Sequence, residues 1–286
     1  MAAGGPLPPI AEAMKSVYQL LQRKNQESLQ RMIRPFYQLI LNLMGVSPET
    51  TPSVLTGTIM REDEDVRYIQ EHPNETKTIE CCLLWCQAMV TFYLHKFGKS
   101  RELLEKCHDL YHKHPHIVLG SLQIPMEFWN AMTAVRLLWR IRIRQTKGAT
   151  ASSKQTAADK KRQASLEATA ENSLQTLKQL AAHSPENVQH KVLMVQGELQ
   201  ALEGHVDTAM ESFQHAIELA EEHGSIADKA VFCEQAGLTL RLCSKEDPAL
   251  DYLEDCCTSY RAWGALIKVN HVKGTVIPEA GYDLED

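Results

Sequence analysis

The stretch that decides the fold is residues 191–224, KVLMVQGELQALEGHVDTAMESFQHAIELAEEHG. Small residues recur in this stretch on both sides of Phe213, with a spacing typical of two helices that pack closely against each other. These small residues are Gly197, Gly204, Ala209 and Ala216. The spacing predicts two antiparallel helices whose backbones approach each other at fixed points.

The pattern returns about forty residues later in the chain. Gly197, Ala209, Phe213 and Ala216 correspond to Gly237, Ala249, Leu253 and Cys256. An internal repeat of this length predicts stacked helical hairpins, none of which buries its apolar face alone. We therefore predict an all-α fold, a right-handed solenoid of tetratricopeptide-like hairpins whose usual period of about 34 residues is stretched to about forty.

An earlier, degenerate repeat is predicted when Gly98 is set against Gly204, with Gly98 as the turn. This alignment places Leu103, Cys107 and Leu110 at the small and aromatic positions of the repeat. Pro35 is expected to kink or interrupt its helix, because proline lacks the N–H that would bond to residue 31. Thr208 with Glu211 resembles a capping box that opens a helix. No segment alternates with period two, so no sheet is expected.

The predicted domain organisation has five parts. Residues 1–9 are a disordered N-terminus, 10–144 are N-terminal helical hairpins with degenerate repeats, 145–162 are a flexible basic insertion, 163–274 are C-terminal tetratricopeptide-like repeats, and 275–286 are an acidic tail.

Composition favours a folded protein without an overall attraction to nucleic acid, because the net charge is −6. No secretory signal and no apolar run long enough for a transmembrane segment are apparent. None of the eight cysteines forms a C-x-x-C pair, and most lie in amphipathic helical patterns. They are expected to be reduced, buried side chains in a cytoplasmic protein.

Two local motifs carry possible chemistry. Gly98-Lys99-Ser100 is similar to the end of a phosphate-binding loop, but the other glycine of that motif is replaced by Tyr93 inside a predicted helix. A hairpin turn is the favoured interpretation. Adjacent Cys81-Cys82 and Cys256-Cys257 could be redox sites, but neighbouring helical residues diverge by about 100°, so packing is favoured.

A histidine cluster invites a metal hypothesis. His108 and His112 share a helix face with Glu105, and His114 and His116 follow. A solvated helix end is favoured over a metal site, because histidine is favourable near a helix C-terminus. We expect no catalytic, cofactor-binding or metal-binding residues and no cofactor.

The strongest charge feature is the stretch 136–162, with a local balance of +8 against −14 for the rest of the chain. Its charged residues are Arg136, Arg140, Arg142, Arg144, Lys147, Lys154, Lys160, Lys161 and Arg162, against Asp159. A basic loop in an acidic protein could contact nucleic acid or an anionic membrane. A solvated insertion is favoured, since only Trp139 lies among these charges to stack on bases.

The C-terminal half resembles the helical-repeat region between the ATPase and GAF domains of large signalling proteins, which combine STAND-type AAA ATPase, GAF and kinase domains. The matching residues are Pro185, Glu186, Asn187, His190, Lys191, Gly204, Ala209, Ala216, Ile217, Leu219 and Ala220, then Tyr260, Trp263, Gly264, Ala265 and Lys268. The ending Y-x-x-W-G-A-x-x-K-V is its most specific part. The resemblance covers about residues 30–274, and it is strong after Ser184.

The resemblance implies a module that couples or senses between ATPase and kinase parts. Because every catalytic domain of that family is missing from the sequence, its activities are not carried over. The leading hypothesis is a non-catalytic interaction and regulatory module that binds a peptide, a protein or a neighbouring ATPase, GAF or kinase domain. The alternatives are an enzyme or enzyme subunit whose site converges in space, and attachment to nucleic acid or membrane through the basic insertion.

Overall fold

The computed structural model describes residues 4–47, 51–114, 122–148 and 156–278. All regular structure in these ranges is helical, with α-helices α1 to α12, the short π-helix η2 and no strand. The predicted all-α class is therefore confirmed, as is the absence of a sheet within these ranges. None of the helices in the described part of the chain is long and apolar enough to cross a lipid bilayer.

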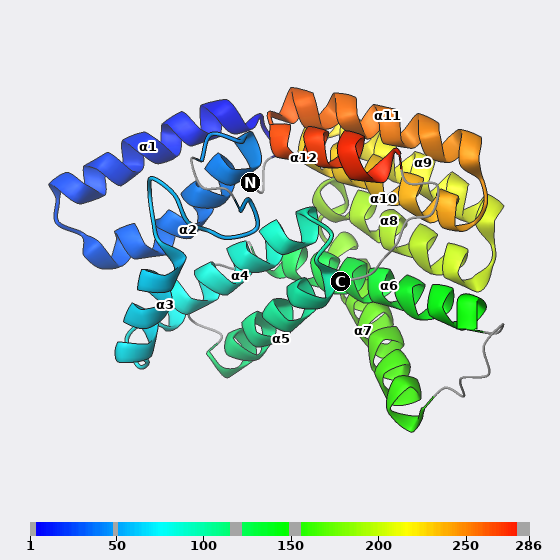
Figure 1. Ribbon diagram of the computed structural model, residues 1–286, viewed down its shortest axis with the longest axis horizontal. Coiled ribbons are helices and arrows are strands. Elements are labelled where there is room, and N and C mark those ends of the chain that lie inside the picture. The colour runs from blue at the N-terminus through cyan, green and yellow to red at the C-terminus, as the bar shows by residue number, and fades with distance from the viewer. Residues whose placement is uncertain (1–3, 48–50, 115–121, 149–155, 279–286) are drawn as a thin grey trace. The chain divides into compact units, whose positions relative to one another are not determined.

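The chain divides into two compact units, and Figure 1 labels the helices that belong to them. Unit 1 comprises the chain up to Leu122 together with Cys257–Pro278, and unit 2 contains Gln123–Cys256. Unit 1 holds α1 (Leu7–Arg23), α2 (Glu27–Met44), α3 (Glu62–Glu71), α4 (Lys77–Tyr93), α5 (Phe97–Lys113), α12 (Leu266–His271) and η2 (Val272–Val276). Unit 2 holds α6 (Gln123–Gly148), α7 (Ala157–Ala181), α8 (Pro185–Glu203), α9 (Val206–Glu222) and α10 (Ile226–Leu242). Helix α11 (Glu246–Trp263) begins in unit 2 and ends in unit 1.

Most helices that turn directly into another helix end in the same way, with one residue in the left-handed conformation. These residues are Asn25, His95, Gly204, Gly224, Ser244 and Gly264. At the end of α8 the next amide, His205 N–H, donates to Gln200 C=O at 2.9 Å, while Gly204 N–H donates to Ala201 C=O at 3.0 Å. These two bonds form the Schellman motif, which satisfies carbonyls that the helix end leaves without partners.

Four of these left-handed residues, from Gly204 to Gly264, stand twenty residues apart. Two helices and their two turns therefore take forty residues, which is the period of the sequence echo. In the α4–α5 turn the left-handed residue is His95, and Gly98 lies in the first turn of α5. The alignment of Gly98 with Gly204 was therefore wrong by three residues. With His95 set against Gly204, the interior positions fall on the buried residues Ser100, Leu104 and Cys107.

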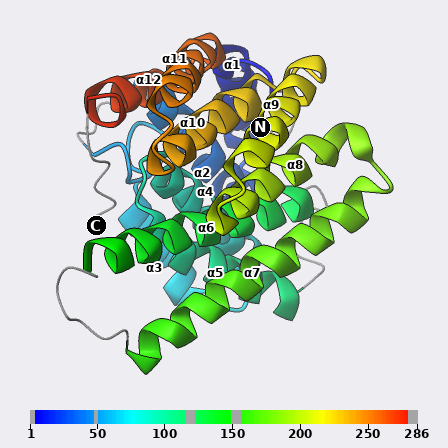
Figure 2. The same ribbon diagram turned by 90° about the vertical axis from the view of Figure 1, so that its right-hand side faces the viewer.

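The helices of unit 2 can be followed in Figure 2. Each helix from α6 to α9 contacts the next one along the chain, and in addition α6 contacts α8 and α8 contacts α10. Close approaches between helices occur at the two glycines of the echo. A Cβ atom on Gly197 would lie 2.6 Å from the Phe213 ring, and one on Gly237 would lie 2.7 Å from Leu253 and 2.9 Å from the Ala249 carbonyl oxygen. The corresponding residues of the two segments thus make corresponding contacts.

A buried ionic network joins α6, α8 and α10. The guanidinium of Arg136 donates to the Glu198 carboxylate and, at 2.7 Å, to the Thr239 hydroxyl. That hydroxyl donates to the other carboxylate oxygen at 2.8 Å, and the Trp139 indole donates to the same oxygen at 3.4 Å. Arg136 and Glu198 are 1% and 0% exposed. Burial raises the pKa of Glu198, while the charge of Arg136 and the hydrogen bonds oppose that shift.

In unit 1, helix α2 packs on α1, α4 and α12, and α4 packs on α3 and α5. The Y-x-x-W-G-A-x-x-K ending lies in this core, with Tyr260, Trp263 and Lys268 buried. The Lys268 ammonium donates to the Tyr93 carbonyl at 2.6 Å and lies 5.3 Å from the centre of the Tyr260 ring. Gly264 is left-handed, and its Cα lies against Pro8, where a Cβ would be 2.9 Å from the ring. The ending therefore anchors the C-terminal helices within unit 1.

Several predicted boundaries differ from the structure. Helix α1 begins at Leu7, inside the range 1–9, because prolines at its first positions need no N–H partner. The range 145–162 is helical at both ends, since α6 continues to Gly148 and α7 begins at Ala157; residues 149–155 lie outside the described ranges. The unit boundary falls at Leu122 rather than after residue 144. Within 275–286, η2 reaches Val276, and residues 279–286 also lie outside the described ranges.

Two smaller local predictions also differ from the structure. Pro35 does not interrupt its helix, since α2 continues through this buried residue. Thr208 is not a cap, because α9 begins at Val206 and its N-cap residue is His205. The capping box of the structure is formed instead by Thr156 and Asp159 at the start of α7. Hydrogen bonds from Thr156 lower the pKa of Asp159.

Candidate functional site

A groove of about 530 Å³ lies on unit 1. Three helices line this groove with apolar, charged and amide side chains. Helix α3 contributes Val66, Ile69 and Gln70, α4 contributes Lys77, Glu80, Leu83, Leu84 and Gln87, and α5 with its C-cap contributes Lys106, Asp109, Leu110, Lys113 and His114. A groove of this size lies within the range of small-molecule sites and also admits a few side chains of a docked helix.

The groove has an apolar floor and a charged rim. Ile69 and Leu83 are buried, while Val66, Leu84 and Leu110 are half-buried and provide the remaining apolar surface. The rim carries three lysines and two acids, and Lys77 bridges to Glu80 at 3.2 Å. The rim is therefore positive by one charge, although the whole chain is negative by six.

The α5 wall follows directly from the sequence spacing. Lys106, Asp109, Leu110 and Lys113 stand at i, i+3, i+4 and i+7, so they form one stripe of the helix. This stripe was not predicted, because it contains no catalytic or metal-ligating motif, and the packing of α3 on α4 is a tertiary feature. The i, i+3, i+4, i+7 spacing on α5 was the available signal.

Two cysteines join the helices that form the groove walls. The thiols of Cys81 on α4 and Cys107 on α5 lie 3.6 Å apart, and both residues are buried. The hydrogen bond between the two thiols lowers the pKa of Cys81 and raises that of Cys107. Burial raises the pKa of Cys82 to about 12. The adjacent residues Cys81 and Cys82 do not pair with each other, as the helix geometry predicts.

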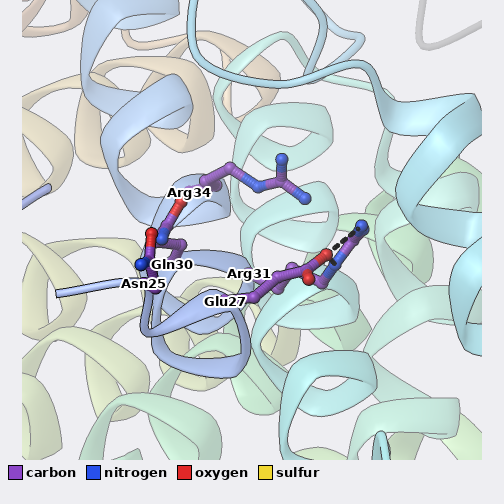
Figure 3. A pocket seen from close by; sticks show the side chains of 5 residues that line it. All are labelled: Asn25, Glu27, Gln30, Arg31 and Arg34. Atoms are coloured by element: carbon purple, nitrogen blue, oxygen red, sulfur yellow. Dashed lines mark hydrogen bonds and ion pairs between the residues drawn. The ribbon is translucent and has the colours of Figure 1, made fainter. Parts of the chain in front are cut away.

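A second, polar depression of about 280 Å³ lies at the start of α2 (Figure 3). It is lined by Asn25, Glu27, Gln30, Arg31 and Arg34. Figure 3 shows Arg31 joined to Glu27, with a shortest distance of 2.8 Å. Arg31 and Arg34 also both donate to the buried carboxylate of Asp65. These carboxylates neutralise the two guanidinium groups, so the depression is not an anion site.

Unit 2 holds a cluster of titratable groups between α8 and α10. The Asp228 carboxylate accepts from Lys191, from His190 at 3.0 Å and from the Ser225 hydroxyl at 2.8 Å. Burial would raise the pKa of Asp228, but Lys191 and His190 outweigh it and hold the pKa well below its usual range. Burial lowers the pKa of His190. The cluster holds the N-terminal turns of α8 and α10 together, and neither of the depressions described above reaches it.

The structure assigns local roles to the other motifs that the sequence singled out. Ser100 is buried and donates to the Ala88 carbonyl at 3.0 Å, and Lys99 bridges to Glu102, so Gly98-Lys99-Ser100 belongs to a helix rather than to a turn or a phosphate loop. In the stretch 136–162, Arg136 and Arg140 are buried, and they are not part of a basic surface.

Of the histidines predicted to cluster on α5, two lie close together. The Nε2 atoms of His108 and His112 lie 3.0 Å apart, whereas Glu105 bridges to Arg101 at 2.8 Å. His114 caps the helix and lines the groove, and His116 lies outside the described residues. Within the described ranges, no group of three or more His, Cys, Asp or Glu side chains could hold a metal ion.

Comparison with known proteins found no family model, no curated protein and no solved structure that matches this chain.

Proposed function

We propose that this chain is a non-catalytic interaction and regulatory module that binds an amphipathic, acidic helix of a protein partner in the groove between α3, α4 and α5. The observation that carries the proposal is the combination of an apolar floor with a lysine-rich rim. Apolar side chains on one face of a helix bind such floors at i, i+3, i+4 and i+7. Acidic residues beside them would complement Lys106 and Lys113.

The wider architecture that we propose is a right-handed solenoid of tetratricopeptide-like hairpins. It is supported by left-handed turns at twenty-residue intervals and by the matching contacts of Gly197 and Gly237. Solenoids of this kind recognise peptides and neighbouring domains along their surfaces. The resemblance to the repeat region of STAND ATPase–GAF–kinase proteins then suggests a partner from such a signalling pathway and a cytoplasmic location.

The two alternative functions have less support from the contacts. The side chains of the titratable cluster around Asp228 hydrogen-bond one another between α8 and α10, which favours a structural role over catalysis. Attachment to nucleic acid or membrane through the basic stretch is weakened, because Arg136 and Arg140 are buried. Binding through the groove is therefore the function that we propose.

Fluorescence polarisation of a labelled synthetic helix tests this proposal. The peptide carries leucines at i, i+3/i+4 and i+7 with glutamates elsewhere, and a second peptide replaces every glutamate by lysine. We expect saturable binding of the acidic peptide only. The double variant Lys106→Glu with Lys113→Glu should bind it at least about ten-fold more weakly, because both charges repel it.

Lys99→Glu is the matched control, because Lys99 is exposed on the same helix but does not line the groove. It should leave the affinity unchanged. Equal affinities of the wild type and the double variant, or no saturable binding by the wild type, would reject the proposed partner. Preferential binding of the lysine peptide would instead indicate a basic partner.

A further inference from the structure

The side chains of His108 and His112 form a preorganised pair on α5. They lie four residues apart and therefore project from the same side of the helix, with ring centres 4.2 Å apart. Their Nε2 atoms face each other at 3.0 Å. This side differs from the stripe of Lys106, Asp109, Leu110 and Lys113 that lines the groove. The pair is therefore a separate feature from the proposed peptide site.

The separation of the two nitrogens matches that of two ligands on one metal ion. Imidazole nitrogen binds zinc at about 2.0–2.1 Å, and two such bonds at tetrahedral or square-planar angles place the nitrogens about 2.8–3.4 Å apart. Two histidines at i and i+4 on a helix are also the spacing by which zinc-binding helices hold their metal. The 3.0 Å separation lies within that range.

We propose that His108 and His112 form a two-ligand site for a divalent late first-row transition metal ion. Each imidazole would donate a lone pair from Nε2 and carry its proton on Nδ1, so a proton on either Nε2 in the metal-free chain would move to Nδ1 through solvent. The described residues supply no third ligand, and Glu105 is held by Arg101, so water would occupy the remaining positions. The expected order of affinity is copper(II) above nickel(II) and zinc(II).

Binding of a metal would have a structural consequence for α5. The two ligands lie one turn apart in the second half of the helix, so an ion would hold the last turns in the helical conformation. Those turns carry Asp109, Leu110 and Lys113 of the groove wall. The metal site itself does not depend on the proposed peptide binding, since its ligands lie outside the groove.

Calorimetric titration of the full chain with nickel(II) and with copper(II), after removal of any tag and treatment with a chelator, tests the site. The wild type should bind one more equivalent than His112→Asn, or should bind that equivalent at least about ten-fold more tightly. His108→Asn should show the same loss. His205→Asn is the matched control, because His205 is an exposed histidine at another helix boundary.

Circular dichroism of each variant without metal verifies that the helices are retained. Metal should raise the unfolding temperature of the wild type and of His205→Asn, but not that of the two α5 variants, because a ligand stabilises only the state that binds it. Identical stoichiometry and affinity in the wild type, His108→Asn and His112→Asn would overturn the proposal. Loss of the equivalent in His205→Asn alone would assign the metal to a different site.

Discussion

The α8–α9 hairpin of unit 2 and the α4–α5 hairpin of unit 1 have the same turn but close in different ways. In α8–α9 the interior position is Gly197, and the absence of a side chain lets the Phe213 ring approach the backbone. In α4–α5 the equivalent residue is Ala88, whose carbonyl accepts a hydrogen bond from the buried Ser100 hydroxyl. In α8–α9 the helices approach closely because one position lacks a side chain, whereas in α4–α5 they are joined by a side-chain hydrogen bond to a backbone carbonyl.

The helices packed beside these hairpins also differ. In unit 2 every helix from α6 to α10 has seventeen or more residues, and each contacts its neighbours in the series. In unit 1 one of the three helices packed on α4 is α3, which has only ten residues. A short helix leaves part of the face of α4 and α5 uncovered, and the groove is found there. The candidate site thus lies where the regular packing is interrupted.

The largest effect is expected when the ionic network of unit 2 is broken, because both of its charged residues are almost fully buried. Glu198→Ala removes the carboxylate and leaves Arg136 buried without its anion. The loss should be about 3–5 kcal/mol of unfolding free energy, measured by urea unfolding. Glu203→Ala is the control, because Glu203 is exposed on the same helix, and its loss should stay within about 0.5 kcal/mol. Equal effects of the two substitutions would contradict a structural role of the network.

A smaller loss is expected at the titratable cluster of unit 2. Asp228→Asn should lower stability at pH 7 by about 1.5–3 kcal/mol, because hydrogen bonds to a charged group are lost. The folded state holds the pKa of Asp228 below its unfolded value near 3.9, so its contribution is complete above that value and declines as the pH falls. The difference from the wild type should therefore narrow by roughly 1 kcal/mol between pH 5 and pH 3. A constant difference in stability over this range would show that Asp228 has an ordinary pKa. Asp207→Asn at an exposed position is the control, and its difference from the wild type should not change with pH in this way.

The same substitution is expected to have opposite effects at two helical glycines, one at a close approach of helices and one at an open position. Gly237→Ala places a methyl group 2.9 Å from the Ala249 carbonyl oxygen, and this backbone atom cannot rotate away. The expected loss is about 1–3 kcal/mol. Gly98→Ala in α5 meets nothing within 4 Å and should be neutral or more stable by up to about 1 kcal/mol. Thermal unfolding of both variants gives the comparison, and a stabilised Gly237→Ala would show that α10 and α11 are not in close contact.

The helical class and the close approach of helices within residues 191–256 could be predicted from the sequence, because a close approach requires glycine or another small residue at a fixed position. The forty-residue echo paired Gly197 with Gly237, and these two residues do face Phe213 and Leu253. The register of α4–α5 could not be read in this way, because its left-handed residue is His95, and histidine carries no turn signal. The groove depends on how short α3 packs, which is a tertiary property. His108 and His112 were recognised as neighbours, but their 3.0 Å separation required side-chain geometry.

The smallest effect concerns the regularity of the turns themselves. Ser244 is exposed and left-handed at φ +60°, at the place where Gly204, Gly224 and Gly264 stand in the other turns. A side chain in this conformation brings its Cβ close to the following carbonyl, and glycine avoids that contact. Ser244→Gly should therefore stabilise the protein by about 0.5–1 kcal/mol in urea unfolding, whereas Gly204→Ser should destabilise it by a similar amount. If Ser244→Gly were destabilising, the turn after α10 would not have the left-handed conformation of the other three turns. Left-handed residues would then no longer recur every twenty residues from 204 to 264.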